Sequence, residues 1–224
     1  MKQVFPNFGK SAIVFLGFVL ITAALRAQAA QILETAPSGV TNGGTSVLTT
    51  QYLGARFHLD TSYLITGIGG HIKAYSSSDR SLFAAIVPLS EPNLLPSDHL
   101  LTNAIYAQVF LAPYNDVGPY PYQVPDTILT TDFLLGPGEY GLVFGSGLFG
   151  ATGSGWMPVS GPIQPLPYFF AMNRFIGDYF RNLDEQPVRF IVQGEPVALP
   201  EPTTAALMSL ALLGFAATQR KRRS

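Results

Sequence analysis

The chain is predicted to fold as an all-β protein, an antiparallel β-sandwich of jelly-roll-like or immunoglobulin-like type. Between residues 32 and 194, short apolar runs rich in Val, Ile, Thr, Tyr and Phe alternate with clusters of Gly, Pro, Asn and Ser. This spacing is typical of strands and turns, and it differs from the pattern of βαβ units. We expect one sandwich domain over residues 30–196, flanked by an N-terminal signal helix and a C-terminal transmembrane helix.

The first strand pattern runs from Ser46 to Leu59, after the turn sequence Asn42-Gly43-Gly44. Its period of two predicts one buried and one exposed face. The buried and the exposed sets are Leu53, Ala55, Phe57 and Leu59 against Tyr52, Arg56, His58 and Asp60. The next strand, Tyr63 to Tyr75, is predicted to contain a bulge or bend at Gly69-Gly70, because glycine tolerates the backbone angles required there.

Leu82 to Val87 is wholly apolar, which predicts a central strand covered on both faces and ending at Pro88. Leu100 to Ala112 reads as another strand. One of its faces carries Ile105, Ala107, Val109 and Leu111. A long loop with three tyrosines follows, over residues 113–122.

Two further strands, Thr127 to Leu135 and Glu139 to Phe144, are predicted to form a hairpin through Gly136-Pro137-Gly138. A glycine-rich loop over residues 145–161 comes next, and the last strands are predicted at 168–172 and 188–192. The charged residues near the end favour a solvated loop with surface ion pairs: Asp178, Arg181, Asp184, Glu185 and Arg189.

Residues 1–29 have the pattern of a secretory signal peptide. Lys2 and Lys10 precede an uncharged apolar run, and Ala27-Gln28-Ala29 supplies the small residues that signal peptidase needs. We expect cleavage after Ala29. Arg26 lies close to this site, which leaves a retained N-terminal anchor as the alternative.

Residues 197–224 combine a turn, an apolar segment and a cationic end. Pro200-Glu201-Pro202 is followed by 17 uncharged residues, 203–219, which is the lower limit for a helix that spans a bilayer. The chain then ends in a basic cluster of Arg220, Lys221, Arg222 and Arg223. Such clusters stay on the cytoplasmic side of a membrane, so the domain is expected outside; the alternative is a buried amphipathic helix.

This order of Pro-Glu-Pro, a short apolar helix containing Gly214 and an Arg-rich end resembles the PEP-CTERM sorting signal of Gram-negative bacteria. The resemblance implies handling by an exosortase, a membrane transpeptidase, with Pro200, Glu201 and Pro202 as recognition residues and not as catalytic ones. The precursor would be held transiently in the inner membrane and then passed to the cell surface or extracellular matrix. The segment from Leu135 to Gly147 also resembles the globular part of PEP-CTERM proteins, which implies a sandwich of unknown role.

Charge and composition exclude several classes of function. Six of the 13 Lys and Arg and all 14 Asp and Glu lie between Arg26 and Arg220, so the mature chain, without its N-terminal segment and its basic end, carries a formal charge of −8. An acidic surface repels nucleic acid and anionic membranes. The absence of cysteine excludes disulfides, thiolate zinc sites and thiol nucleophiles.

No cofactor or metal is predicted. Gly145 to Gly150 matches G-x-G-x-x-G, but the broken sequence after it does not favour the helix that a dinucleotide needs. The three histidines, His58, His71 and His99, are scattered. His58 and His71 could meet across adjacent strands, but we interpret them as exposed, solvated strand residues and not as metal ligands. The acidic residues lack calcium-loop spacing, and nothing marks a carboxylate pair for glycoside hydrolysis.

The aromatic residues of two loops offer one candidate binding site. Exposed aromatic rings could form a stacking platform for sugars from Tyr114, Tyr120, Tyr122 and Trp156. The alternative is that Trp156 and Phe149 pack under the glycine-rich loop as core. We therefore expect an exported, non-enzymatic matrix protein, with a carbohydrate-binding module as the alternative and a secreted hydrolase as a weaker one.

Overall fold

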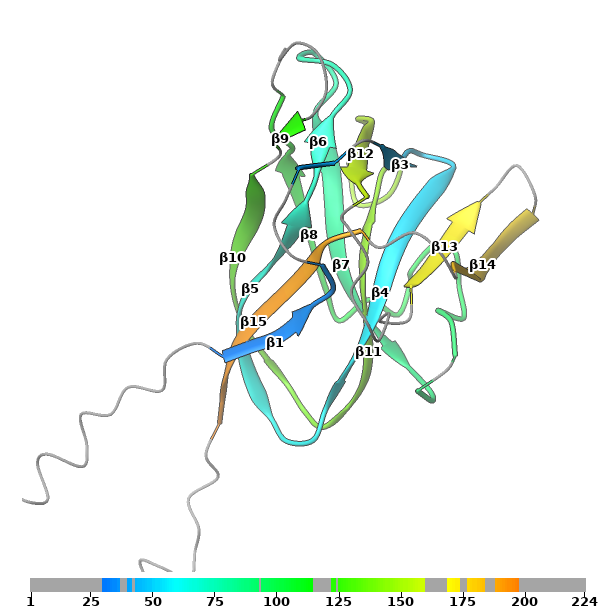
Figure 1. Ribbon diagram of the computed structural model, residues 1–224. Coiled ribbons are helices and arrows are strands. Elements are labelled where there is room, and N and C mark those ends of the chain that lie inside the picture. Colours follow the sequence, from blue (N-terminus) through cyan, green and yellow to red (C-terminus); the bar gives the residue numbers. More distant parts are fainter. Residues whose placement is uncertain are drawn as a thin grey trace, which may run out of the picture.

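The computed structural model describes residues 30–36, 40–41, 43–92, 94–114, 122–123, 125–159, 169–173, 177–183 and 188–197. These residues form antiparallel β-sheets (Figure 1), so the predicted all-β class is confirmed. No helix within the described ranges has the length and apolar character needed to cross a bilayer. The terminal helices predicted for residues 1–29 and 203–219 lie outside those ranges.

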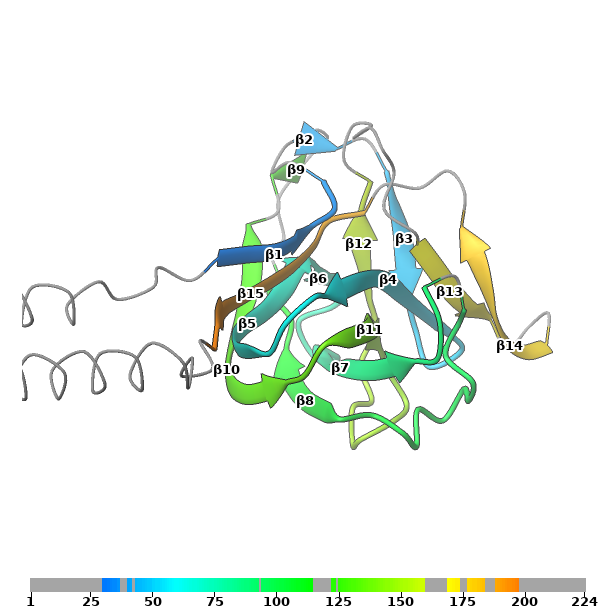
Figure 2. The same cartoon turned by 90° about the horizontal axis from the view of Figure 1, so that it is seen from below.

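Two large sheets enclose the main core. The first contains, in spatial order, β1 (Ala30–Glu34), β15 (Phe190–Pro196), β5 (Tyr63–His71) and β10 (Asp126–Leu135). The second contains β14 (Gly177–Leu183), β13 (Phe169–Asn173), β4 (Gln51–Leu59), β11 (Gly138–Gly145), β7 (Ser81–Leu89) and β8 (Tyr106–Leu111). Figure 2 shows β1 and β15 on one side of the molecule and β13 and β14 on the other. Buried side chains from both sheets, such as Ile68 and Phe144, meet in one apolar cluster.

Two smaller sheets complete the described structure. One is three-stranded and contains β3 (Gly44–Val47), β12 (Gly155–Pro158) and β6 (Lys73–Ala74); the other pairs β2 (Val40–Thr41) with β9 (Tyr122–Gln123). Both lie at the end of the molecule that is uppermost in Figure 1. The predicted glycine-rich loop therefore contains a strand, β12, and Trp156 belongs to that strand.

Eight strands pair from the outside of the chain inward. β1 pairs with β15, β4 with β11, β5 with β10, and β7 with β8. This is the pattern of one long hairpin folded over on itself. Apart from β7 and β8, strands that are consecutive within this nested set, such as β10 and β11, consequently lie in different sheets. The connection at Gly136-Pro137 passes from one sheet to the other, and the predicted hairpin turn there is wrong.

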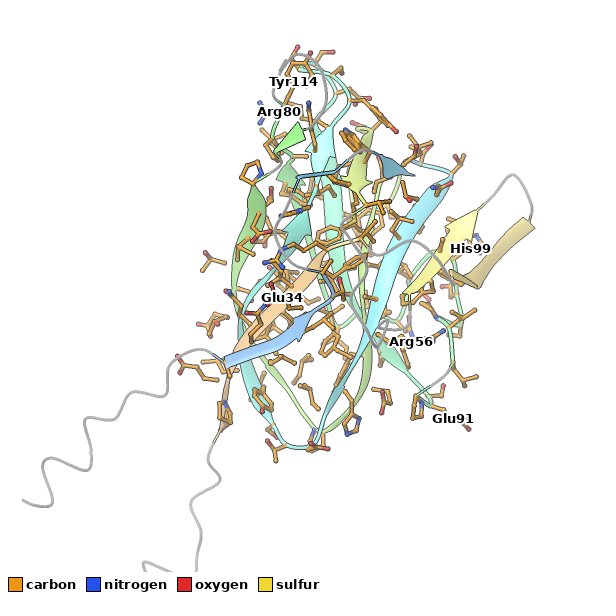
Figure 3. The ribbon with its side chains drawn as sticks, in the orientation of Figure 1. Glu34, Arg56, Arg80, Glu91, His99 and Tyr114 are labelled. Carbon is orange, nitrogen blue, oxygen red and sulfur yellow. The ribbon has the colours of Figure 1, made fainter. Side chains whose placement is uncertain are left out.

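The face of β4 that was predicted to be exposed is mostly buried. Tyr52 packs edge-on against Phe83, with ring centroids 5.2 Å apart. The Arg56 guanidinium lies 5.8 Å from the centre of the Phe170 ring, and its Nε donates to the Leu94 carbonyl at 2.9 Å (Figure 3). The prediction fails because β13 and the connection after β7 cover this face and create a second apolar cluster.

The predicted bulge at Gly69-Gly70 is also wrong, since β5 pairs regularly there with both neighbours. A Cβ atom on Gly69 would lie 2.1 Å from the Thr127 carbonyl oxygen, and one on Gly70 would lie 2.1 Å from that of Arg189. These glycines serve close approach between strands instead of a bend.

Strand β7 is covered on both faces, as predicted, although it continues past Pro88 to Leu89. Pro88 is tolerated because it lies beyond Ile86, the last β7 residue paired with β8, where β7 is an edge. Strand β8 begins six residues later than predicted, because Leu101 and Ala104 donate backbone hydrogen bonds within turns. The segment 177–183, predicted as part of a solvated loop, is strand β14 paired with β13.

Candidate functional site

A row of three side chains crosses the small sheet formed by β3, β12 and β6. Trp156 is directly opposite Ser46 on β3 and Lys73 on β6. Residues directly opposite each other in antiparallel strands share a face. The next residues along β3 and β6, Val47 and Ala74, are fully buried in the main core. The row of Trp156, Ser46 and Lys73 therefore lies on the outer face.

Glycine at position 44 makes room for the tryptophan. A Cβ atom there would lie 2.0 Å from Cε3 of Trp156, so the half-buried indole ring lies against the backbone of β3 at this residue. Any larger residue at Gly44 would displace the ring or the strand. The ring thus lies against a strand of the sheet instead of projecting freely from a loop.

Two tyrosines extend the row. The Tyr75 hydroxyl lies 2.7 Å from Oγ of Ser46, and 49% of the tyrosine is exposed. Nζ of Lys73 lies 6.0 Å from the centre of the Tyr114 ring, within the range of cation–π attraction. We call these five residues, Trp156, Ser46, Lys73, Tyr75 and Tyr114, the aromatic face.

Tyr114 is positioned by the backbone that precedes it. The Pro113 carbonyl accepts a hydrogen bond from Ala74 N of β6 at 2.9 Å, and the Ala112 carbonyl accepts one from Nε of Arg80 at 2.8 Å. Figure 3 shows Tyr114 and Arg80 together at the end of the molecule where the small sheets lie. The end of the β8 segment is thereby attached to the sheet that carries Trp156.

The four aromatic residues singled out from the sequence have different outcomes. Tyr114 and Trp156 are brought to the same face through Lys73. Tyr122 lies in β9, but its side chain is not described, and Tyr120 lies outside the described residues. Sequence reasoning missed Tyr75; its only signal was an aromatic residue at the end of an apolar run, directly before three serines.

The alternative placement of Trp156 and Phe149 in the core is not what the structure has. Phe149 is exposed over 44% of its surface and contacts Phe83 edge-on, with centroids 5.2 Å apart. The G-x-G-x-x-G segment turns back on itself, since Gly147 N donates to the Ala151 carbonyl at 2.7 Å. It leads into β12 and not into a helix, so the helix N-terminus that would hold a pyrophosphate is not formed.

A second polar group is buried across the first large sheet. Nε and Nη2 of Arg189 donate to the two carboxylate oxygens of Asp126 at 2.8 and 3.0 Å, and Nη1 donates to Glu34 and to the Ala36 carbonyl. Nε2 of His71 lies 2.9 Å from Asp126 Oδ1. We call Arg189, Asp126, Glu34 and His71 the arginine cluster.

The arginine cluster corrects two sequence predictions. Arg189, expected in a surface pair, is buried, and His71, expected to be exposed, is only 1% exposed. His71 and His58 lie in different sheets, so they cannot meet across adjacent strands. Burial is the main reason that the pKa of His71 is lowered; Asp126 opposes the shift and Arg189 adds to it. Nδ1 of His71 has no hydrogen-bond partner among the described residues.

The charges of the arginine cluster are matched to each other. Burial alone would raise the pKa of Asp126, but the hydrogen bonds and positive charge of Arg189 lower it below the usual range. The hydroxyl of Thr35, which lies in the same part of the sheet, donates to the Val188 carbonyl at 2.5 Å and accepts from Phe190 N at 2.7 Å. The cluster therefore has the chemistry of an internal ion pair, with no free hydroxyl at Thr35 to act as nucleophile.

A third polar group lies on the surface at the start of the β4–β5 connection. Nδ1 of His58 is 2.5 Å from Oε1 of Glu139, and Nε2 is 2.9 Å from Oδ1 of Asp60. The hydrogen bond to Asp60 is the main cause of a raised pKa of His58. Here too a basic side chain lies between two carboxylates. Within the described ranges, no three His, Asp or Glu side chains are grouped so that they could hold a metal ion.

Comparison with protein-family models gives no match to this chain, and comparison with curated proteins gives none either.

Proposed function

We propose that this chain is an exported, non-enzymatic protein of the cell surface or exopolysaccharide matrix, and that its domain contacts polysaccharide through the aromatic face. The observation that carries the proposal is the row of Trp156, Ser46 and Lys73 with Tyr75 and Tyr114 beside it. It combines aromatic rings with hydroxyl and ammonium groups; Tyr75 is exposed, and the other four residues are half-buried, with Tyr114 also packed against the main core.

The chemistry of this face is complementary to sugars. A sugar ring has apolar C–H patches that stack on an aromatic ring, and its rim carries hydroxyls that need hydrogen-bond partners. Trp156 supplies a large ring fixed against Gly44, while Ser46 and Tyr75 supply hydroxyls 2.7 Å from each other. Because the ring and the hydroxyls belong to strands or directly follow them, they are already in place before a ligand binds.

The strand order supports a jelly-roll-like sandwich over an immunoglobulin-like one. In the nested pairing, β1 pairs with β15 and β7 with β8, and the strands between them pair in the same inward order. Jelly rolls are eight-stranded, two-sheet folds of this kind, and lectin domains are among the proteins that use them. A shared architecture does not by itself imply a shared function, so the proposal rests on the chemistry of the aromatic face and the architecture is only consistent with it.

The positions of the two ends fit the proposed sorting. Ala30 at the start of β1 is paired with Gly194 near the end of β15, so both flanking segments leave the domain at the same place. In Figure 1 this place is at the opposite end of the molecule from β3, β6 and β12. A precursor held by residues 197–224 in the inner membrane would present the aromatic face away from that membrane. Signal peptidase and exosortase are the proposed processing partners.

The binding proposal is tested by replacing the ring. We expect Trp156→Ala to weaken retention of the full chain on exopolysaccharide from the native cells by about tenfold, which corresponds to about 1.4 kcal/mol. Tyr75→Ala should have a smaller effect in the same direction. The matched control is Leu134→Ala, which changes an exposed apolar residue of β10 outside the face. Unchanged retention of Trp156→Ala, with the domain folded, would overturn the proposal.

The sorting proposal has a separate test. Mass spectrometry of the mature protein from native cells should find a chain that begins after Ala29 and lacks the residues beyond about Pro202. Replacing Glu201 with Ala should leave the C-terminal segment in place and keep the protein with the membrane fraction. Recovery of the wild-type protein with an intact basic end, Arg220 to Ser224, would contradict processing.

A further inference from the structure

Strand β8 is an open edge of the second large sheet. Among the described residues it pairs only with β7. Ala112 N donates to the Arg80 carbonyl at 2.9 Å, so within Tyr106–Leu111 every second residue back from Ala112 directs its backbone groups toward β7. The N–H and C=O groups of Ala107, Val109 and Leu111 consequently point away from the sheet. Just before the strand, Ile105 N also donates to β7, to the Ile86 carbonyl at 2.9 Å.

Along its described residues, this edge lacks the charge and the proline that often protect one. Natural edge strands carry charged side chains, proline or a bulge, which prevent pairing with another chain. Residues Tyr106–Leu111 read Tyr-Ala-Gln-Val-Phe-Leu, without charge or proline, and the pairing with β7 has no bulge. Strand β10, the edge of the other large sheet, differs because it carries Asp126 and Asp132 and is interrupted by a bulge between Thr130 and Phe133.

Apolar side chains surround the open edge. Leu111 is 67% exposed and Ile105 50% exposed, and Val109 is also exposed. Val109 is directly opposite Phe83 of β7, and the exposed ring of Phe149 rests on the ring of Phe83.

Phe149 is held in an unfavourable backbone conformation. Its φ of 55° lies in the left-handed region, which large side chains rarely adopt. The glycine-rich turn that contains it is closed by hydrogen bonds of Gly147 and Ala151. Such strain is kept where the position of a side chain matters. The turn thus presents an exposed aromatic ring next to the open strand.

We propose that this surface, the β8 edge (Ile105, Ala107, Val109, Leu111 and Phe149), joins two copies of the chain by antiparallel pairing of β8 with its own copy. The strand is self-complementary in the register that places Val109 opposite Val109 of the second copy. Leu111 then lies opposite Ala107, so a large side chain meets a small one on both sides of the two-fold axis. A two-fold interface uses the same patch on both chains, as this one does.

Charge favours a second copy at this surface in particular. Two copies of an acidic chain repel each other, but the β8 edge contains no charged residue, so they can meet here without placing like charges in contact. The β8 edge shares no residue with the aromatic face. A dimer would carry two aromatic faces, and two contacts on one polysaccharide raise the overall affinity without any new type of contact.

The register is tested by cross-linking, for which the chain is suited because it contains no cysteine. In the proposed pairing the two Val109 Cα atoms are about 5.5 Å apart. We expect the full-length Val109→Cys chain, in mild detergent, to give a covalent dimer with a short bismaleimide reagent. Leu134→Cys, at an exposed position on β10, is the matched control and should stay monomeric on a denaturing gel. Equal cross-linking of both variants would overturn the proposed interface.

The association itself is tested by mass. Sedimentation of the full-length chain should give a mass of two chains, and Leu111→Lys and Val109→Lys should each reduce it to one. Leu134→Lys should leave it unchanged. Leu111 is the most exposed of these residues, so its replacement spares the fold, which far-ultraviolet circular dichroism would verify. A monomeric wild-type chain, or a dimer that survives both β8 substitutions, would overturn the proposal, whether or not the aromatic face binds polysaccharide.

Discussion

The arginine cluster and the aromatic face both bring polar groups together from separate strands, but only the first is centred on a buried side chain, Arg189. In the arginine cluster, the Arg189 guanidinium donates hydrogen bonds to Asp126, to Glu34 and to the Ala36 carbonyl. In the aromatic face, the hydroxyls of Ser46 and Tyr75 lie at the surface, next to exposed ring. Polar groups that satisfy each other internally serve the fold, whereas those left at the surface beside apolar area can serve a partner.

The largest effect should come from breaking the arginine cluster. Arg189→Ala leaves the partly buried carboxylates of Asp126 and Glu34 without their cation, and removing one partner of a buried ion pair costs about 3 to 5 kcal/mol. We expect a loss at the lower end of this range, because both carboxylates remain partly exposed. Chemical denaturation would measure the free energy of unfolding. Retention on polysaccharide should be unchanged under conditions where the variant is folded.

Arg80→Ala is the matched control for that experiment. Its guanidinium donates to a single backbone carbonyl, that of Ala112, so the expected loss is smaller, about 1 to 2 kcal/mol. A loss for Arg80→Ala as large as that for Arg189→Ala would mean that the arginine cluster contributes no more to the fold than a surface hydrogen bond.

A smaller effect is expected from pH. Since the pKa of buried His71 lies below its value of about 6.5 in an unfolded chain, the unfolded chain takes up a proton first as the pH falls. The contribution of His71 to stability is therefore complete above about pH 6.5 and is lost as the pH falls through the folded pKa. The lowered pKa of Asp126 adds a further loss at more acidic pH.

His58 provides the comparison of opposite sign. Its pKa is raised, so the stability that it contributes is present below about pH 6.5 and is lost as the pH rises through the folded value. In His71→Gln, the rise of the unfolding free energy with pH should therefore flatten below about pH 6.5, whereas in His58→Gln its fall with pH should flatten above about pH 6.5. The same change of slope in both variants would show that the two histidines are not in the different environments described above.

The smallest change in stability should accompany Gly44→Ala. The added Cβ collides with the indole of Trp156 and must move the ring, while every side chain of the aromatic face is retained. Because position 44 is exposed at the start of β3, the unfolding free energy should fall by less than about 1.5 kcal/mol. Retention on polysaccharide should fall several-fold. Full retention would mean that the position of the ring against β3 has no role in binding.

The sequence predicted the strands that depend on local pattern. The all-β class and the doubly covered strand β7 were predictable because six consecutive apolar residues, Leu82 to Val87, need cover on both faces. Strand β4 was not predictable in the same way. Its alternation identified a strand, but Tyr52 and Arg56 are buried by segments distant in the chain, and a periodic pattern carries no information about what will fold over it.

The two polar sites differ in the same respect. Two of the five residues of the aromatic face, Tyr114 and Trp156, could be chosen from the sequence, because aromatic residues among glycine and proline are conspicuous. The arginine cluster could not, since it joins Glu34 to Arg189 across 155 positions. One signal was present: Arg189 is a lone cation beside the apolar run Phe190–Val192. A charge in such a setting indicates a buried partner more often than a solvated loop.

The nested pairing of strands has a consequence for the timing of folding. β1 pairs only with β15 in the described structure, so the first strand stays without a partner until the last one has been made. Of the nested pairs, only β7 with β8 joins consecutive strands, and contacts of long sequence separation form slowly. The first large sheet is therefore completed only when its last strand has been synthesised; under the proposed export, the chain would begin to cross the membrane before that sheet is complete.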